Sequence, residues 1–199
     1  LMSMQLDLNQ AGYVVTSFHG GWTKEMNRYD TTVNIGKFVN SSYTGSSSSR
    51  CNPFFMVSEP GTSETMGNCY GFNLVYSGNF QAGTQVDQVG KLRAFMGMGN
   101  EDFSWLLESG ESFETPEVVM VYTKEGLGEM SRIFHRVYKK RLLRGVYKEG
   151  KRPILVNNWE ATYFNFDEKK LLEIAKEASR LGVELLVMDD GWFGKRNSD

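Results

Sequence analysis

The sequence predicts a mixed fold, in which an antiparallel β-sandwich is followed by a helix and by the first part of a parallel β/α domain. Three observations lead to this prediction: short apolar runs separated by turn residues up to residue 123, helical spacing from about residue 125, and a strand–helix–strand pattern after residue 150. We therefore expect a sandwich domain over residues 1–123, a linker helix within 124–148 and the start of a β/α domain over 149–199.

The first part of the chain has the rhythm of an antiparallel sandwich. The opening residues LMSMQLDLN alternate apolar and polar side chains, and in YGFNLVYS large side chains alternate with small or polar ones. Clusters of Gly, Ser, Asn and Pro, such as GSSSSR and SEPGTSETMGN, mark the turns between strands. The strands expected from these signals after the opening one are Tyr13–Phe18, Thr32–Val39, Pro53–Ser58, Tyr70–Ser77, Lys91–Gly97 and Glu117–Thr123.

A connecting helix is expected over Glu125–Arg144, because apolar residues there recur at three- and four-residue spacing. The basic run KKRLLR stands at its C-terminal end, where positive charge suits the helix dipole. We interpret this run as a solvated helix end and not as a ligand site.

The last part of the chain predicts one βαβ unit. Pro153–Asn158 (PILVNN) and Val183–Met188 (VELLVM) have the composition of buried strands. Between them, Asp167 can cap an amphipathic helix that Gly182 ends. We expect the two strands to be parallel, with a right-handed crossover.

This β/α segment is too short to be a domain. A (β/α)8 barrel typically needs about 250 residues, and two parallel strands with one helix leave a sheet face uncovered. Leu1 is not a natural start, and the chain opens in the middle of a strand pattern. We therefore expect the chain to be a piece of a longer protein.

The composition argues against several classes of partner. The net charge is −2 and the pI about 5.8, with no marked basic patch, which argues against nucleic acid and favours a neutral or weakly polar ligand. Two cysteines fit free thiols better than a disulfide, and two distant histidines lack metal-type neighbours. No apolar run approaches the ~20 residues that cross a bilayer. We expect no membrane partner, no metal and no cofactor.

Aromatic and acidic side chains follow both strands of the βαβ unit. The first strand is followed by Trp159 and Glu160, and the second by Asp189, Asp190 and Trp192. Because ligands gather at the C-terminal ends of parallel strands, we expect these groups to share one rim. Tryptophan rings stack on the C–H faces of a pyranose, and carboxylates accept strong hydrogen bonds from hydroxyls. The pattern indicates a monosaccharide pocket, with Glu160 in a supporting structural role.

The adjacent aspartates fit hydroxyl binding better than acid–nucleophile catalysis. Neighbouring residues of an extended chain point to opposite sides, whereas a retaining glycosidase needs two facing carboxyls about 5 Å apart. Two alternatives stay open for Asp189 and Asp190. One aspartate could cap the next helix while the other is solvated, or the pair could bind Mg²⁺ or Ca²⁺.

Several stretches of the sequence resemble glycoside hydrolase family 36, the larger bacterial-type α-galactosidases. RPILVNNWEATYFNFDE and VELLVMDDGWFGKRNSD are similar to the family's first two barrel strands with their loops. FHGGWTKEMNRYD resembles the segment that carries a substrate-contacting tryptophan, and SSRCNPFFMVSE and YGFNLVYSGNF resemble strands of the N-terminal domain. The combination of WEA and DDGW at this spacing is specific, whereas DDGW alone would be weak.

The resemblance implies an N-terminal β-supersandwich, a linking helix and a truncated (β/α)8 TIM barrel. It implies retaining hydrolysis of terminal non-reducing α-D-galactosyl residues, as in melibiose and raffinose. Asp189 and Asp190 would match the aspartate pair that grips galactose hydroxyls, Trp22 a sandwich-domain tryptophan at the pocket rim, and Trp159 the aromatic after the first barrel strand.

The resemblance also implies what this chain lacks. The family's nucleophile, in a KWD-type motif, and its acid/base aspartate do not occur in the sequence. We assign no catalytic residue and expect the isolated chain to be inactive. The family implies a homotetramer in which one subunit's sandwich domain approaches a neighbour's barrel, and we expect a cytoplasmic enzyme.

Other functions and other roles for the tryptophans remain open from the sequence. The chain could be a stand-alone carbohydrate-binding sandwich, a related α-N-acetylgalactosaminidase or galactosyl transferase, or a metal-dependent β/α enzyme. Trp22 follows Gly20 and Gly21 in a predicted turn and could instead cover the sandwich core. Trp105 is expected in the core.

Overall fold

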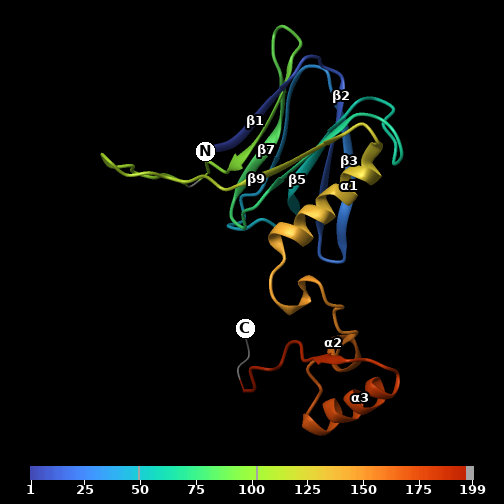
Figure 1. Ribbon diagram of the computed structural model, residues 1–199. Helices are drawn as coiled ribbons and strands as arrows, with labels where there is room; N and C mark the ends of the chain where they lie inside the picture. The colour runs from blue at the N-terminus through green and yellow to red at the C-terminus, as the bar shows by residue number, and fades with distance from the viewer. Residues whose placement is uncertain (49, 102, 196–199) are drawn as a thin grey trace. The chain divides into compact units, whose positions relative to one another are not determined.

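The structure, a computed structural model, describes residues 1–48, 50–101 and 103–195 (Figure 1). The chain forms two compact units, Leu1–Tyr138 and Lys139–Asp199, which we call the sandwich unit and the β/α unit. Residues 196–199, at the end of the segment expected to begin a barrel, lie outside the described residues.

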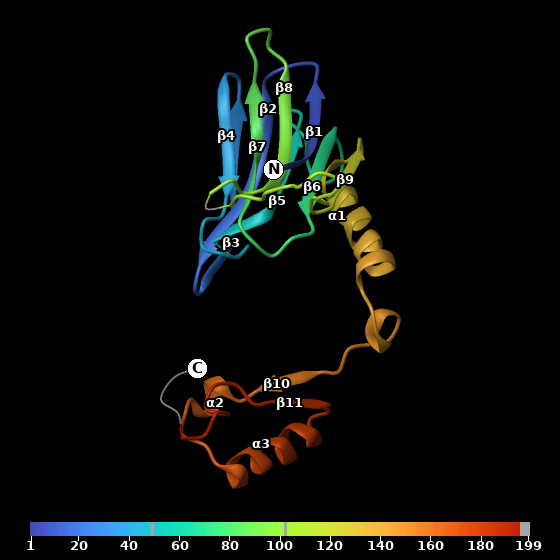
Figure 2. The same ribbon diagram turned by 90° about the vertical axis from the view of Figure 1, so that its left-hand side faces the viewer.

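The sandwich unit consists of two antiparallel sheets whose strands run alongside one another (Figure 2). One sheet has four strands in the order β1-β8-β7-β4, and the other has five in the order β3-β2-β5-β6-β9. The strands are β1 (Met2–Leu8), β2 (Tyr13–Gly21), β3 (Lys24–Val33), β4 (Gly36–Ser41), β5 (Cys51–Ser58), β6 (Cys69–Leu74), β7 (Phe80–Val86), β8 (Leu92–Met98) and β9 (Val118–Thr123).

The main core lies between the inward faces of the two sheets. Strand alternation supplies it, since Phe55 and Val57 of β5 and Phe72 of β6 all have no exposed surface. The rings of Phe55 and Phe72, paired across β5 and β6, stack with centroids 4.8 Å apart. Burying such side chains contributes about 1.5–3 kcal/mol each, so this layer holds the sheets together.

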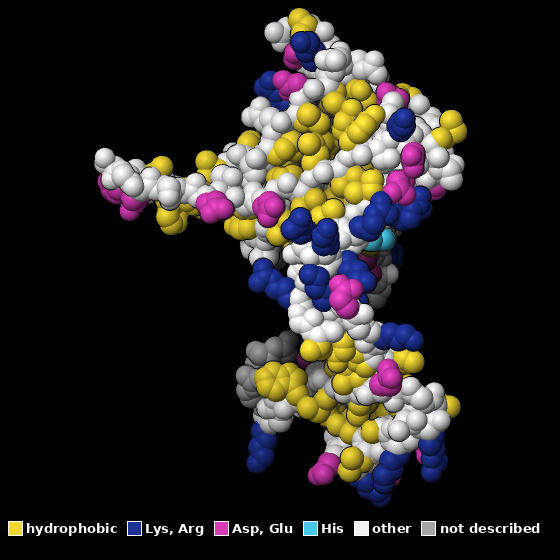
Figure 3. Space-filling view, viewed as in Figure 1, with side chains coloured by type: hydrophobic (Ala, Val, Ile, Leu, Met, Phe, Trp, Pro, Cys, Tyr) yellow, Lys and Arg dark blue, Asp and Glu magenta, His cyan; other side chains and the backbone are white. Residues whose placement is uncertain are grey.

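Helix α1 (Gly126–Val137) covers the outer face of the five-stranded sheet. Met56, which alternates with the core residues of β5, packs beneath it with Met130 and Phe134 of the helix. Gly71 of β6 allows the close approach, because a Cβ there would stand 2.5 Å from the Phe134 ring and 2.7 Å from Met130 Sδ. On its polar side Glu129 pairs with two arginines of the helix. Figure 3 shows Lys and Arg side chains, in dark blue, gathered around the lower part of the sandwich unit.

The antiparallel sandwich is confirmed. The helix expected over Glu125–Arg144 is present but shorter, because α1 ends at Val137 and the chain continues as a π-helical turn over Tyr138–Leu142. One expected strand is wrong, and two strands were not foreseen. The expected strand Thr32–Val39 is wrong, because a turn at 34–35 divides it, and Gly36 (φ 77°) starts the next strand. Strands β3 and β7 were not foreseen. β3 is an edge strand and mostly exposed, whereas β7 is an inner strand with several small or polar residues, so neither shows a clear apolar alternation.

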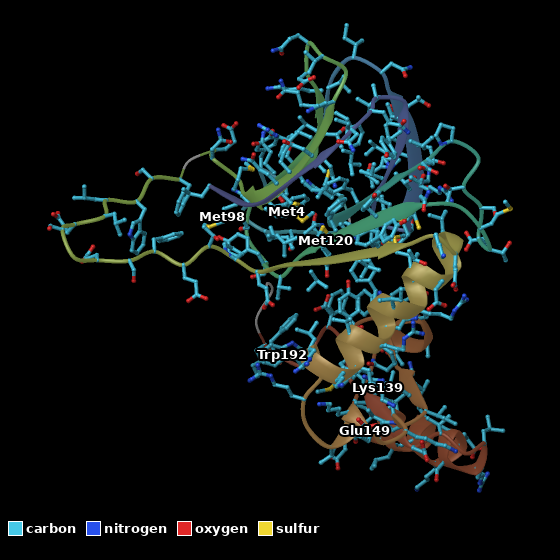
Figure 4. The ribbon with its side chains drawn as sticks, turned by 45° about the horizontal axis from the view of Figure 1, so that its top comes forward. Met4, Met98, Met120, Lys139, Glu149 and Trp192 are labelled. Carbon is cyan, nitrogen blue, oxygen red and sulfur yellow. The ribbon has the colours of Figure 1, made fainter. Side chains whose placement is uncertain are left out.

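The β/α unit contains the predicted strand–helix–strand. β10 (Leu155–Asn157) and β11 (Leu185–Val187) pair in parallel, and α3 (Glu168–Arg180) connects them. Asp167 caps α3 by accepting a hydrogen bond from Lys170 N at 2.9 Å, as expected. The remaining elements are η1 (Tyr138–Leu142), η2 (Val146–Lys148) and the short helix α2 (Trp159–Thr162). Before β10, Lys139 and Glu149 form an ion pair of 3.2 Å that connects the segments of η1 and η2; both residues are labelled in Figure 4.

Candidate functional site

Both strands of the β/α unit end at the same rim. In the parallel register Asn157 pairs with Val187, and the backbone N–H of Asn158 then donates to the Val187 carbonyl at 3.2 Å. The residues after β10 therefore lie beside those after β11. The structure brings Trp159 and the Asp189–Asp190 pair to the C-terminal ends of the two strands, as the parallel arrangement predicted.

The side chain of Asn157 joins the two strand ends. Its Nδ2 donates to Asp189 Oδ2 at 2.6 Å, and its Oδ1 accepts the Trp159 backbone N–H at 2.7 Å. A hydrogen bond to a carboxylate is stronger than one between neutral groups. One amide thus contacts both an acidic and an aromatic residue of the site.

Asn158 makes a second, buried connection. It has no exposed surface; its Oδ1 accepts the Asp189 backbone N–H at 2.8 Å, and its Nδ2 donates to Thr162 Oγ1 at 2.8 Å. Thr162 in turn donates to the Asn158 carbonyl at 3.1 Å. The backbone of Asp189 is therefore fixed by a fully buried amide.

The two aspartates have different surroundings. Asp189 Oδ1 accepts the Asp190 backbone N–H at 2.8 Å, so both oxygens of the Asp189 carboxylate have partners. Within the described residues, the Asp190 carboxylate accepts no hydrogen bond and forms no ion pair, and it is half-buried. The chain turns directly afterwards at Gly191 (φ 96°), where a Cβ would stand 3.0 Å from the Phe166 ring.

Aromatic rings surround Trp159. The Tyr163 and Phe164 rings both meet it edge-on, with centroids 5.2 and 4.9 Å away. Tyr163 has a left-handed backbone (φ 48°), which is costly for a non-glycine residue and turns the chain after α2. Its hydroxyl donates to Glu160 Oε2 at 3.2 Å, consistent with the supporting role expected for Glu160.

Trp192, labelled in Figure 4, lies on the turn after the aspartates. Its side chain is 63% exposed. Its ring meets that of Phe193 with centroids 5.9 Å apart. Trp192 therefore follows the second strand as expected, and its role in binding a sugar stays a prediction.

Trp22 lies in the sandwich unit, at the tip of the hairpin formed by β2 and β3. It is 91% exposed, so the alternative that it covers the sandwich core is wrong. Gly20 is required here, because a Cβ would stand 2.5 Å from the Lys24 carbonyl oxygen. Asn27 Nδ2 donates to that same oxygen at 2.6 Å and stabilises the turn of the hairpin. The fold presents this indole to solvent on a defined turn.

The prediction that Trp105 lies in the core is also wrong. It is 59% exposed and lies on the arm between β8 and β9, which projects from the sandwich in Figure 1. Its ring packs against Phe113, with centroids 5.1 Å apart. Aromatic residues that pack against one another within a loop have the same composition as those of a core strand. Composition alone therefore led to the wrong prediction for Trp105.

Sequence reasoning missed the two asparagines as functional residues. Both stand in the NNW segment directly before Trp159. The available signal was the pair of amides at the end of a buried strand, since polar groups next to a buried strand need partners.

Among the described residues, no group of three or more His, Cys, Asp or Glu could hold a metal ion. No helix in the described part of the chain is long and apolar enough to cross a membrane.

The family models assign this arrangement, a β-sandwich followed by a parallel β/α unit with tryptophan and aspartate side chains at its strand ends, to the glycoside hydrolases. Residues 1–108 match the model of the glycosyl hydrolase family 36 N-terminal domain, and residues 112–199 match the melibiase model. The chain belongs to glycosyl hydrolase family 36.

Relatives and solved structures agree with this assignment. The chain is 47% identical to alpha-galactosidase AgaA of Geobacillus stearothermophilus, with 100% of the chain and 27% of the relative covered. It is 43% identical to alpha-galactosidase Mel36A of Lactobacillus acidophilus, over 99% of the chain and 27% of the relative. The crystal structure of AgaA superposes with a TM-score of 0.95 over 99% of this chain and 27% of that one.

The match defines which part of the family this chain represents. It spans about 27% of the length of these relatives, and it corresponds to the N-terminal β domain followed by the start of the catalytic domain. The predicted family and fold class are therefore confirmed.

Proposed function

We propose that the protein containing this chain is a retaining α-galactosidase that removes terminal non-reducing α-D-galactosyl residues from oligosaccharides such as melibiose and raffinose. The relatives named above are alpha-galactosidases, and a variant of AgaA has been crystallised in complex with raffinose. The observation that carries the proposal is the shared rim, where Trp159 and the two aspartates are joined by Asn157.

Within this site we assign the two aspartates different tasks. Asp190 has a carboxylate that is free of protein partners in the described chain, so it can accept hydrogen bonds from two sugar hydroxyls. Asp189 is held at both oxygens and offers only its remaining lone pairs. Trp159 and Trp192 supply the apolar faces of the pocket. The nucleophile and the acid/base catalyst belong to later parts of the protein.

The test is galactoside turnover by the native gene product that contains this sequence. We expect Asp190→Asn to lower kcat/KM for raffinose on the order of ten- to hundredfold, because charged hydrogen bonds contribute about 1.5–3 kcal/mol each. Glu173→Gln is the matched control: the same change of carboxylate to amide, at an exposed position of α3 with no ion pair among the described residues. It should leave turnover unchanged.

The outcomes separate this proposal from its alternatives. Galactose binding without hydrolysis would indicate a carbohydrate-binding protein. Preference for α-N-acetylgalactosaminides, or galactosyl transfer in place of hydrolysis, would indicate a related enzyme of the same architecture. Full raffinose turnover by an enzyme lacking both Asp189 and Asp190 carboxylates would refute the assignment of the rim.

We further propose that the full protein is a homotetramer in which Trp22 reaches the pocket rim of a neighbouring subunit. The support is its exposure at a braced hairpin tip, away from any hydrophobic cluster of its own unit. Sedimentation velocity gives the oligomeric state. A monomeric enzyme with full activity would refute this arrangement.

A further inference from the structure

We infer that Asn157 is a positioning residue, which holds the Asp189 carboxylate in the orientation that accepts a sugar hydroxyl. This inference rests on the proposed function, because it takes Asp189 as a substrate-binding group. It adds a residue from the opposite strand to the binding machinery.

The side chain of Asn157 makes two hydrogen bonds. Its Nδ2 donates to Asp189 Oδ2 at 2.6 Å, across from β10 to the segment after β11, and its Oδ1 accepts the Trp159 N–H at 2.7 Å. An amide carries a donor and an acceptor at a fixed separation. The side chain therefore sets the distance between the aspartate and the backbone that carries the tryptophan.

The Asp189 carboxylate is then fixed about both of its oxygens. Oδ2 is held by Asn157, and Oδ1 accepts the Asp190 N–H at 2.8 Å. A carboxylate has about four lone-pair sites, so two such bonds define its plane and leave about two sites for a ligand. A carboxylate that is already oriented loses little rotamer freedom when a sugar binds.

A purely structural role for Asn157 makes a different prediction. The bond from Trp159 N–H to Oδ1, two residues along the chain, is an Asx-turn, and aspartate replaces asparagine well in such turns. If the turn is all that matters, Asn157→Asp is tolerated. If Asn157 acts through Asp189, the same substitution removes the donor and places a second carboxylate against the first.

The experiment compares Asn157→Asp and Asn157→Ala with the matched pair Asn165→Asp and Asn165→Ala in the native protein. Asn165 is exposed, and its side chain makes no hydrogen bond to the described residues. We expect both Asn157 variants to lose on the order of tenfold or more in kcat/KM for raffinose. The loss should lie mainly in KM, and Asn157→Asp should be no better than Asn157→Ala. Both Asn165 variants should remain at wild-type values.

Thermal unfolding of each variant is measured alongside the kinetics. Asn157 is exposed and both of its hydrogen bonds lie at the strand ends of the β/α unit, so the cost of either substitution is local and the midpoint of global unfolding should stay close to wild type. The inference is overturned if Asn157→Asp keeps activity within about threefold of Asn165→Asp. It is also overturned if activity falls only in step with a lowered unfolding midpoint. A wild-type protein without α-galactosidase activity would instead refute the proposed function.

Discussion

The buried amide of Asn158 gives a prediction whose size follows from two contacts. Asn158→Ala removes the acceptor of the Asp189 N–H and the donor to Thr162 Oγ1, both at 2.8 Å. Each bond contributes about 0.5–1.5 kcal/mol, and an amide left without an acceptor costs about 1–3 kcal/mol. We therefore expect the free energy of local opening at this rim to fall by about 2–4 kcal/mol.

Hydrogen exchange at the Asp189 amide measures this change directly. A fall of that size should accelerate exchange by on the order of 30-fold or more, provided that exchange proceeds through local opening. Thr162→Val is the internal control, because it removes the partner of Asn158 Nδ2 and leaves the Asp189 acceptor in place. Unchanged exchange in Asn158→Ala, or equal acceleration in both variants, would refute the role of this amide in fixing Asp189.

Three further predictions follow from the sandwich unit. Trp22→Ala should lower kcat/KM for raffinose in the native protein and leave thermal unfolding unchanged, because the side chain is 91% exposed; a lowered unfolding midpoint would contradict this. Gly71→Ala should lower the free energy of unfolding of the unit by about 1–3 kcal/mol in denaturant unfolding, because its Cβ would stand 2.5 Å from the Phe134 ring. An unchanged free energy of unfolding would mean that α1 shifts away from β6 without cost. Burial raises the pKa of the Cys69 thiol, so at pH 8 a thiol reagent should modify Cys51 well before Cys69 in peptide-level mass spectrometry, and equal rates would contradict the buried position.

The architecture followed from local patterns that are strong in this sequence. The alternation in YGFNLVYS indicates one strand of the sandwich. The cap at Asp167 and the stop at Gly182 mark the two ends of α3, and the apolar runs before and after this helix indicate a βαβ unit. Strands β3 and β7 escaped prediction because burial in a sheet depends on neighbouring strands, which the local sequence does not record. The prediction for Trp105 failed for the same reason, because the local sequence does not show whether an aromatic side chain packs in the core or against another loop residue.

The site was predicted less completely than the fold. Trp159, Asp189 and Asp190 could be found because residues after parallel strands share a rim, a rule of topology. Which aspartate is held and which is free depends on side-chain hydrogen bonds across two strands, and these appear only in three dimensions. The asparagines were visible in the sequence, but their partners lie about thirty residues away.

The same asparagines also specify the register of the two strands. A slip of β11 by one residue relative to β10 would move each of its side chains to the other face of the sheet and shift it by about 3.3 Å. Asn157 would then lose the Asp189 carboxylate, and Asn158 would lose the Asp189 N–H. β10 and β11 each have only three residues, so their own ladder constrains the register weakly. The bonds that orient Asp189 for a ligand therefore also keep the two shortest strands of the chain in register, and loss of either asparagine should affect binding before it affects the sandwich unit.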